Sequence, residues 1–148
     1  NNWSYRHARR IWSIATNPDL KYHWLLDFDC DMIDLFRKNT ILGIPPVDLV
    51  WEKNDDLVLA YHRGPWLFVY NFNPMQSFTD YRIPLGAGKY RPALSTDNGR
   101  YGGQDRIDET LTYYTLPVAG PDSQHYLRLY LPARTAVVLL REEIRKVK

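Results

Sequence analysis

The chain has 148 residues, of which 45% are hydrophobic and 24% are charged, as expected for one folded domain with a short additional segment. Its 19 lysines and arginines against 17 acidic residues give a net charge of +2, which excludes the broad basic surface that attracts nucleic acid or anionic membrane. No apolar run reaches the length of about 20 residues that spans a bilayer, and no signal peptide opens the chain, so we expect a cytoplasmic protein.

The first part of the chain has helical periodicity. Apolar residues at helical spacing predict a first helix over Trp3–Thr16, which Asn17-Pro18-Asp19 ends. A second helix is expected from about Leu20, because apolar residues again recur every three or four positions. This apolar stripe consists of Trp24, Phe28, Met32, Leu35 and Phe36. Two short helices cannot bury so large a face, so we expect a segment outside this chain to cover it.

The pattern changes after Gly43-Ile44-Pro45-Pro46, because two consecutive prolines cannot continue a helix. We therefore expect a helical segment over residues 1–46 and an all-β domain over residues 47–148. Strands are expected at Asp48–Lys53, Leu57–Arg63, Trp66–Asn71, Thr79–Ile83, Lys89–Leu94, Leu111–Thr115, Tyr126–Leu131 and Thr135–Leu140. Turn residues separate these short strands, which is typical of an antiparallel β-sandwich. The longer connection Ser95–Glu109 is expected to be a crossover or surface loop.

The ionisable residues form no strong catalytic or metal-binding pattern. The four histidines occur in no HxH or HExxH arrangement and no phosphate-binding glycine motif is present, so neither a metal ion nor a cofactor is expected. Asp27, Asp31 and Asp34 share one helix face, and a solvated surface is favoured there over a metal cluster. The single cysteine, Cys30, lies in the apolar helical pattern and is expected to be a small core residue.

The aromatic content is unusually high, with 11 tyrosines and 5 tryptophans. Most of these rings alternate within the expected strands and are therefore predicted to lie in the core. Rings that remain exposed stack well on the C–H faces of sugars and on nucleic-acid bases. Because the chain has no basic stripe, carbohydrate is the expected ligand.

Several spaced blocks, in this order along nearly the whole chain, resemble the C-terminal part of the 1,4-α-glucan branching enzymes of the α-amylase superfamily. The blocks are Asn1–Trp12, Phe28–Met32, Asn71–Pro74 through Tyr81-Arg82, Tyr101-Gly102-Gly103, Arg106-Ile107-Asp108 and Leu131–Ala136. Ile11, Asn73 and Glu109 differ from the residues that the family usually has, which weakens any sugar contact assigned to those positions. The glycines, prolines and aromatic residues that define the fold follow the family pattern.

The resemblance implies two helices from the end of a (β/α)₈ barrel followed by an amylase-type C-terminal all-β domain, a Greek-key antiparallel β-sandwich. It implies retaining transglycosylation of α-1,4-glucan, which forms the α-1,6 branches of glycogen or starch with an aspartate nucleophile and a glutamate acid/base. These carboxylates would precede Asn1, where the chain begins without methionine, so we assign no catalytic residue and expect the isolated chain to be inactive. The implied partners are α-glucans such as glycogen and amylose, and the missing catalytic barrel of the same chain.

Glucan contacts are expected at two places. The segment after the last barrel strand would open on the substrate face of the barrel. In this segment the resemblance assigns Asn2, Trp3, Tyr5 and Arg9 to substrate binding. An equal alternative for Trp3 is a structural role beside Trp12. On the sandwich, Trp66 is expected to bind sugar, because it follows the Gly64-Pro65 turn at a strand start where rings are often partly exposed. The alternative function is an independent carbohydrate-binding module, which would not need the apolar helical stripe.

Overall fold

The computed structural model describes residues 11–118 and 124–142. Two α-helices, α2 (Trp12–Ala15) and α3 (Tyr22–Lys38), precede the first described strand, and a short 3₁₀ helix, η1 (Ile41–Gly43), follows α3. The strands are β1 (Asp48–Lys53), β2 (Val58–Arg63), β3 (Trp66–Asn71), β4 (Phe78–Leu85), β5 (Lys89–Ser95), β6 (Tyr113–Tyr114), β7 (Leu116–Pro117), β8 (His125–Leu131) and β9 (Thr135–Glu142), with a second 3₁₀ helix, η2 (Gly99–Tyr101), between β5 and β6. No helix among the described residues is long and apolar enough to cross a membrane.

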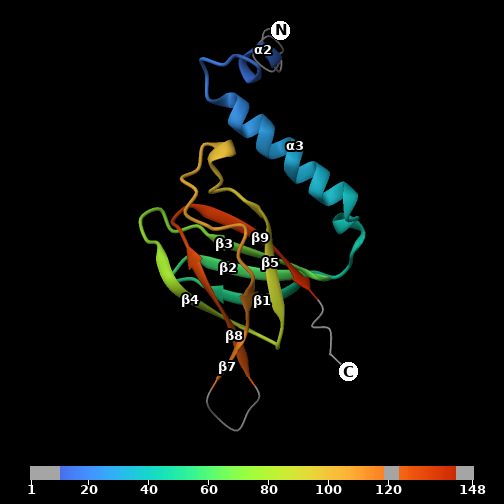
Figure 1. Ribbon diagram of the computed structural model, residues 1–148, viewed down its shortest axis with the longest axis vertical. Helices are drawn as coiled ribbons and strands as arrows, with labels where there is room; N and C mark the ends of the chain where they lie inside the picture. The colour runs from blue at the N-terminus through green and yellow to red at the C-terminus, as the bar shows by residue number, and fades with distance from the viewer. Residues whose placement is uncertain (1–10, 119–123, 143–148) are drawn as a thin grey trace, which may run out of the picture.

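The described strands form two antiparallel sheets that pack face to face (Figure 1). One sheet has six strands in the order β1-β2-β3-β9-β5-β6, and the other has three strands in the order β4-β8-β7. The last described strand, β9, lies between β3 and β5, so it pairs with strands from much earlier in the chain. The prediction of a mainly β, antiparallel fold preceded by two helices is confirmed.

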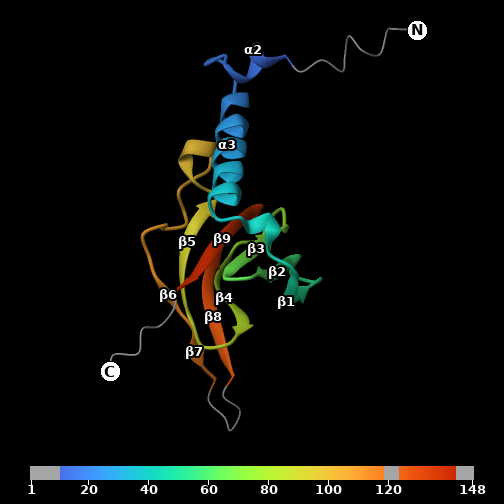
Figure 2. The ribbon, with the colours of Figure 1, turned by 90° about the vertical axis from the view of Figure 1, so that its right-hand side faces the viewer.

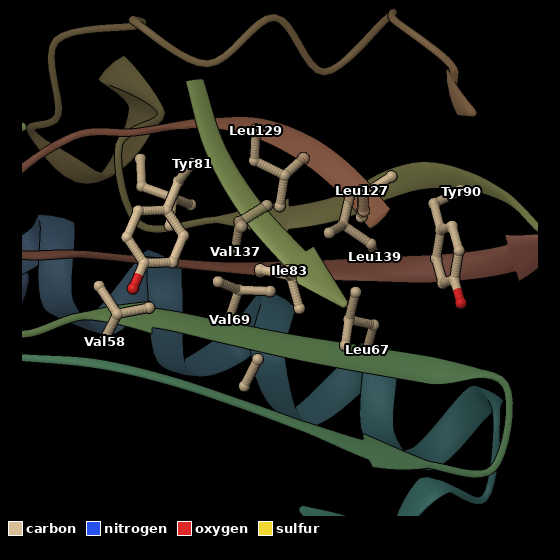
Figure 3. Packing of buried hydrophobic residues seen from close by; sticks show 12 residues of the cluster. Val58, Leu67, Val69, Tyr81, Ile83, Tyr90, Leu127, Leu129, Val137 and Leu139 are labelled. Atoms are coloured by element: carbon tan, nitrogen blue, oxygen red, sulfur yellow. The ribbon is translucent and has the colours of Figure 1, made fainter. Parts of the chain in front are cut away.

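The main core fills the space between the two sheets (Figure 3). Strand alternation places Leu67 and Val69 of β3 on this inner side, facing Ile83 of β4 and Leu127 of β8. Because aliphatic side chains from both sheets interdigitate here, each sheet removes the apolar face of the other from water.

Helix α3 packs against the outer side of the six-stranded sheet, with its C-terminal end next to the strands and the rest of the helix extending beyond them (Figure 2). The second buried cluster consists of Ile41, Trp66, Phe68, Leu94 and Val138. Phe28, Met32, Leu35 and Phe36 of the predicted helical stripe pack against it. The expectation that a segment outside the chain covers this stripe is therefore wrong, because the sandwich itself covers most of it.

The observed elements follow the predicted ones closely where the sequence pattern is strong. Strands β1 and β3 have the predicted bounds, and α3 begins two residues after Leu20. Of the first predicted helix, α2 covers Trp12–Ala15, and residues 3–10 lie outside the described residues. The predicted strand Leu111–Thr115 is reduced to the two residues of β6, and the two-residue strand β7 was not predicted. The domain boundary after residue 46 stays a prediction.

Candidate functional site

The structure contradicts the expected exposure of one predicted sugar-binding residue and does not describe the other four. Trp66 has only 5% of its surface exposed, because its ring lies in the cluster with Ile41 and Phe68 between the sheet and α3. The expected partly exposed ring is therefore wrong, and Trp66 offers no face for stacking on a sugar. Asn2, Trp3, Tyr5 and Arg9 lie outside the described residues, and their role in glucan binding stays a prediction.

The most elaborate polar arrangement in the described part of the chain lies in the connection between β5 and β6. We call residues Asp97–Arg106 the clamp loop. Its centre is Asp97, whose side chain is 2% exposed and pairs with the guanidinium of Arg106. The Asp97 Oδ1 atom accepts hydrogen bonds from Nη2 and Nε of Arg106 at 2.5 and 3.1 Å, and Oδ2 accepts one from the Arg106 backbone N–H at 2.7 Å. The two ends of the loop are thus joined through a buried carboxylate.

Two glycines allow the clamp loop to close tightly. A Cβ atom on Gly103 would lie 2.1 Å from the backbone carbonyl of Asp97, so no side chain fits there. Gly102 has a φ of +79°, and a Cβ atom on it would lie 2.3 Å from the ring of Trp24 on α3. Only glycine combines this left-handed backbone with such close contact, which explains the Gly-Gly pair in the sequence.

The clamp loop holds α3 through Asp31. The Tyr101 hydroxyl donates a hydrogen bond to Oδ2 of Asp31 at 2.6 Å, and Nη1 of Arg100 lies 2.7 Å from the same oxygen. The Tyr101 ring also packs edge to face on Phe28, with 5.4 Å between ring centroids. Burial and the bond to Asp31 raise the pKa of the Tyr101 phenol above its usual value, so the hydroxyl remains a donor at neutral pH.

A second apolar face of α3 remains open to solvent. It lies roughly 100° around the helix axis from the buried stripe and presents Tyr22, Leu25 and Ile33. Trp12 and Leu42 extend it at either end, and all five side chains are exposed. We call these residues the outer face of α3. The N-terminal half of the helix projects past the edge of the sheets, where the loop containing η2 reaches it (Figures 1 and 2).

Two open hollows lie along this outer face. The first has a volume of about 300 Å³ and the second a volume of about 460 Å³. The first is lined by Ile11, Trp12, Ile14, Ala15, Tyr22, Leu25, Leu26 and Asp29. The second is lined by Met32, Ile33, Phe36, Arg37, Thr40, Leu42 and Gly43. Because the linings are mainly aliphatic and aromatic, this surface is suited to packing against apolar side chains.

The predicted carboxylate face of α3 has structural partners. Asp34 lies 3.0 Å from Nζ of Lys38 one turn later, and Asp31 binds the clamp loop. Among residues 11–118 and 124–142, no group of three or more histidine, cysteine, aspartate or glutamate residues is placed to hold a metal ion. Cys30 is exposed, so its predicted place in the core is wrong. Its position on the helix points away from the stripe that the sheet buries.

The Tyr101-Gly102-Gly103 block is notable in the sequence only for its resemblance to the family, and its contact with α3 was not predicted. Three glycines in one long connection were the available signal, because such glycines often mark a close approach of backbone to another element. The pairing of Asp97 with Arg106 left no comparable signal, since opposite charges nine residues apart in a loop are common.

Comparison with known proteins gives a consistent result. Residues 50–142 match the family described as "Alpha amylase, C-terminal all-beta domain". Proteins named 1,4-alpha-glucan-branching enzyme are similar over almost the whole chain: that of Candida glabrata is 38% identical over 96% of the chain, and that of Rhizophagus irregularis is 39% identical over 94%. The enzyme of Equus caballus is 32% identical over 94% of the chain. In each case the chain spans about a fifth (20%) of the relative's length.

Proposed function

The chain belongs to the family of alpha-amylase C-terminal all-beta domains, and from this membership we propose that it is the C-terminal, non-catalytic portion of a 1,4-α-glucan branching enzyme. The complete protein would transfer segments of α-1,4-glucan by retaining transglycosylation and form the α-1,6 branches of glycogen or starch. In this proposal the present chain stabilises the catalytic barrel and supports the binding of glucan. The observation that carries the supporting role is the outer face of α3.

Covering the outer face of α3 would be strongly favourable. Each large apolar side chain that passes from water into a packed interface contributes about 1.5–3 kcal/mol. Trp12, Tyr22, Leu25, Ile33 and Leu42 are all exposed on this one surface, and the two hollows beside them can receive side chains of a partner. We propose that the partner is the (β/α)₈ barrel of the same protein, in which α3 serves as an outer helix.

The alternative, an independent carbohydrate-binding module, has less support. The buried stripe of α3 does not separate the two proposals, because the sandwich covers it in either case. The outer face does separate them, since an isolated module has no use for a second apolar helix face. This face therefore favours the function of a domain built into a larger enzyme.

The proposed function predicts where activity resides. Amylose treated with the complete protein should show the change in iodine spectrum that accompanies branching, whereas the isolated 148-residue chain should produce neither this change nor new reducing ends. The reason is that the nucleophile and acid/base are proposed to lie in the barrel. Activity of the purified chain that disappears when one of its own carboxylates is replaced would overturn the proposal.

A matched pair of substitutions tests the docking of the outer face. Leu25 on α3 and Leu49 on the edge strand β1 have the same side chain and nearly equal exposure, 61% and 62%. In the complete protein we expect Leu25→Asp to lower the free energy of unfolding by at least about 2 kcal/mol, because a carboxylate would be buried against the barrel. Leu49→Asp should change it by less than about 0.5 kcal/mol. Equal thermal and denaturant stability of both variants would show that the barrel does not cover α3.

A further inference from the structure

A row of aromatic rings crosses the outer face of the six-stranded sheet and ends in solvent. Phe68 stacks on Tyr61 with 4.9 Å between ring centroids and 12° between ring planes. Tyr61 is followed by Tyr70 at 6.0 Å, and Tyr70 by Phe72 at 5.4 Å and 3°. Phe68 lies against Phe36 of α3, whereas Phe72 is 60% exposed. The row thus begins beneath the helix and ends with an open ring.

The exposed end of this row is held rigidly. The side chain of Asn71, which is buried, donates hydrogen bonds to the carbonyl oxygens of Gln76, Leu131 and Pro132. The backbone N–H of Phe72 donates to the carbonyl of Leu57 at 2.9 Å, and that of the next residue donates to Oδ1 of Asn71 at 3.0 Å. Because the backbone on both sides of Phe72 is fixed, a ligand that stacks on the ring orders little additional structure.

The surroundings of the ring suit a neutral, polyhydroxylated ligand. Leu59 is paired with Tyr70 in the sheet and with Glu52 on the other side, so these three side chains point to the same face. Glu52 is exposed and supplies a carboxylate that can accept hydrogen bonds from sugar hydroxyls. The hydroxyls of Tyr61 and Tyr70 lie 3.2 Å apart and hold the two rings in register. The nearby Lys53 faces Asp55 at 3.8 Å, so its positive charge is partly compensated and is a weaker attraction for a phosphate group.

We propose that Phe72 and Tyr70 form a stacking platform for an α-1,4-glucan chain. The C–H face of a glucose ring would lie on the open face of Phe72, and its hydroxyls would reach Glu52 at the sheet edge. The choice of glucan rests on the proposed function, while the platform itself rests on the described contacts. Unlike Trp66, Phe72 is a sandwich aromatic whose ring a sugar can reach.

The test is made in the complete protein and compares the loss of two exposed aromatic rings of similar size. Phe72→Ala is compared with Tyr114→Ala on β6, whose ring is 58% exposed in a different part of the sheet. We expect Phe72→Ala to weaken the binding of amylose about tenfold, measured as retardation in native gels that contain amylose, because one stacking contact is lost. Tyr114→Ala and Phe72→Tyr should bind as the wild type does. Maltoheptaose should also slow hydrogen exchange at the amides of residues 70–76 in the wild type, and not in Phe72→Ala.

Unchanged affinity for amylose in Phe72→Ala would overturn the platform. If the melting temperature of this variant is also lowered, another part of the complete protein covers the ring. The iodine assay on the same preparations separates this failure from that of the proposed function: a protein that branches amylose but binds it equally well without the Phe72 ring contradicts the platform alone.

Discussion

Replacing Arg106 with alanine is expected to lower the free energy of unfolding by about 3–5 kcal/mol, one of the two largest effects that we predict for a single substitution in this chain. The Asp97 carboxylate is 2% exposed and accepts hydrogen bonds from Nε and Nη2 of the Arg106 guanidinium. Without this partner the buried negative charge keeps only the backbone N–H of residue 106 as a donor, and the clamp loop loses its side-chain link. Denaturant unfolding followed by tryptophan fluorescence measures the loss, and the contact of Trp24 with Gly102 makes the signal sensitive to this loop.

Two other substitutions distinguish the effect of breaking the buried ion pair from the general effect of removing an arginine. Arg106→Lys keeps the charge but loses the planar two-pronged geometry, so its stability should fall between those of the wild type and Arg106→Ala. Arg100→Ala removes an arginine from the same loop whose side chain is 58% exposed, and should lower the free energy of unfolding by no more than about 1 kcal/mol. If Arg106→Ala were as stable as Arg100→Ala, the Asp97 carboxylate would have to be hydrated in solution.

Strands could be predicted from the sequence because both their interiors and their ends carry local signals. The run Trp66–Asn71 consists mainly of aromatic and β-branched residues and lies between a Gly-Pro turn and Asn73-Pro74, and the observed strand has these bounds. The strand predicted at Leu111–Thr115 was too long, because only the two residues of β6 pair in the sheet, and the two-residue strand β7 could not be separated from a loop. The pairing of β9 with β3 and β5 depends on contacts between distant parts of the chain, which periodicity does not report.

The sequence predicted which helical residues need cover but not what covers them. The spacing of Phe28, Met32 and Phe36 indicated a buried stripe, and the structure buries it. That the sandwich provides the cover depends on the angle at which α3 leaves the sheet, which η1 and the clamp loop determine together. The same limit explains Trp66: its place after a turn suggested exposure, whereas the cover comes from Ile41, which lies 25 residues earlier.

The exposed part of the candidate site was harder to predict than the core. Tyr22, Leu25 and Ile33 lie on α3 outside the predicted stripe, and single exposed apolar residues are common on any protein surface. They indicate a second apolar face of α3 only once the structure shows that the sheet covers the predicted stripe. Phe72 likewise follows the end of a strand, and only the structure places its ring parallel to that of Tyr70.

Phe68→Ala is the second substitution for which we expect a loss of about 3–5 kcal/mol in the free energy of unfolding. Phe68 is buried on the outer side of β3, while its neighbour Val69 is buried on the inner side, so this central strand contributes to both cores. Removing the ring takes away the stacking partner of Tyr61 and a contact of Phe36 on α3. The space left cannot close without moving the helix, and the cavity term therefore adds to the lost burial. Denaturant melts give the loss directly.

Phe72→Ala provides the matched control, because the same side chain is removed from the exposed end of the same ring row. Its loss should stay below about 1 kcal/mol, since little buried surface disappears. A loss below about 1 kcal/mol for Phe68→Ala as well would mean that α3 does not rest on the sheet in solution, because a ring covered by Phe36 and Ile41 cannot be removed without opening a cavity. A large loss in Phe68→Ala together with a small one in Phe72→Ala would place the helix on the buried end of the row and leave its far end accessible to a ligand.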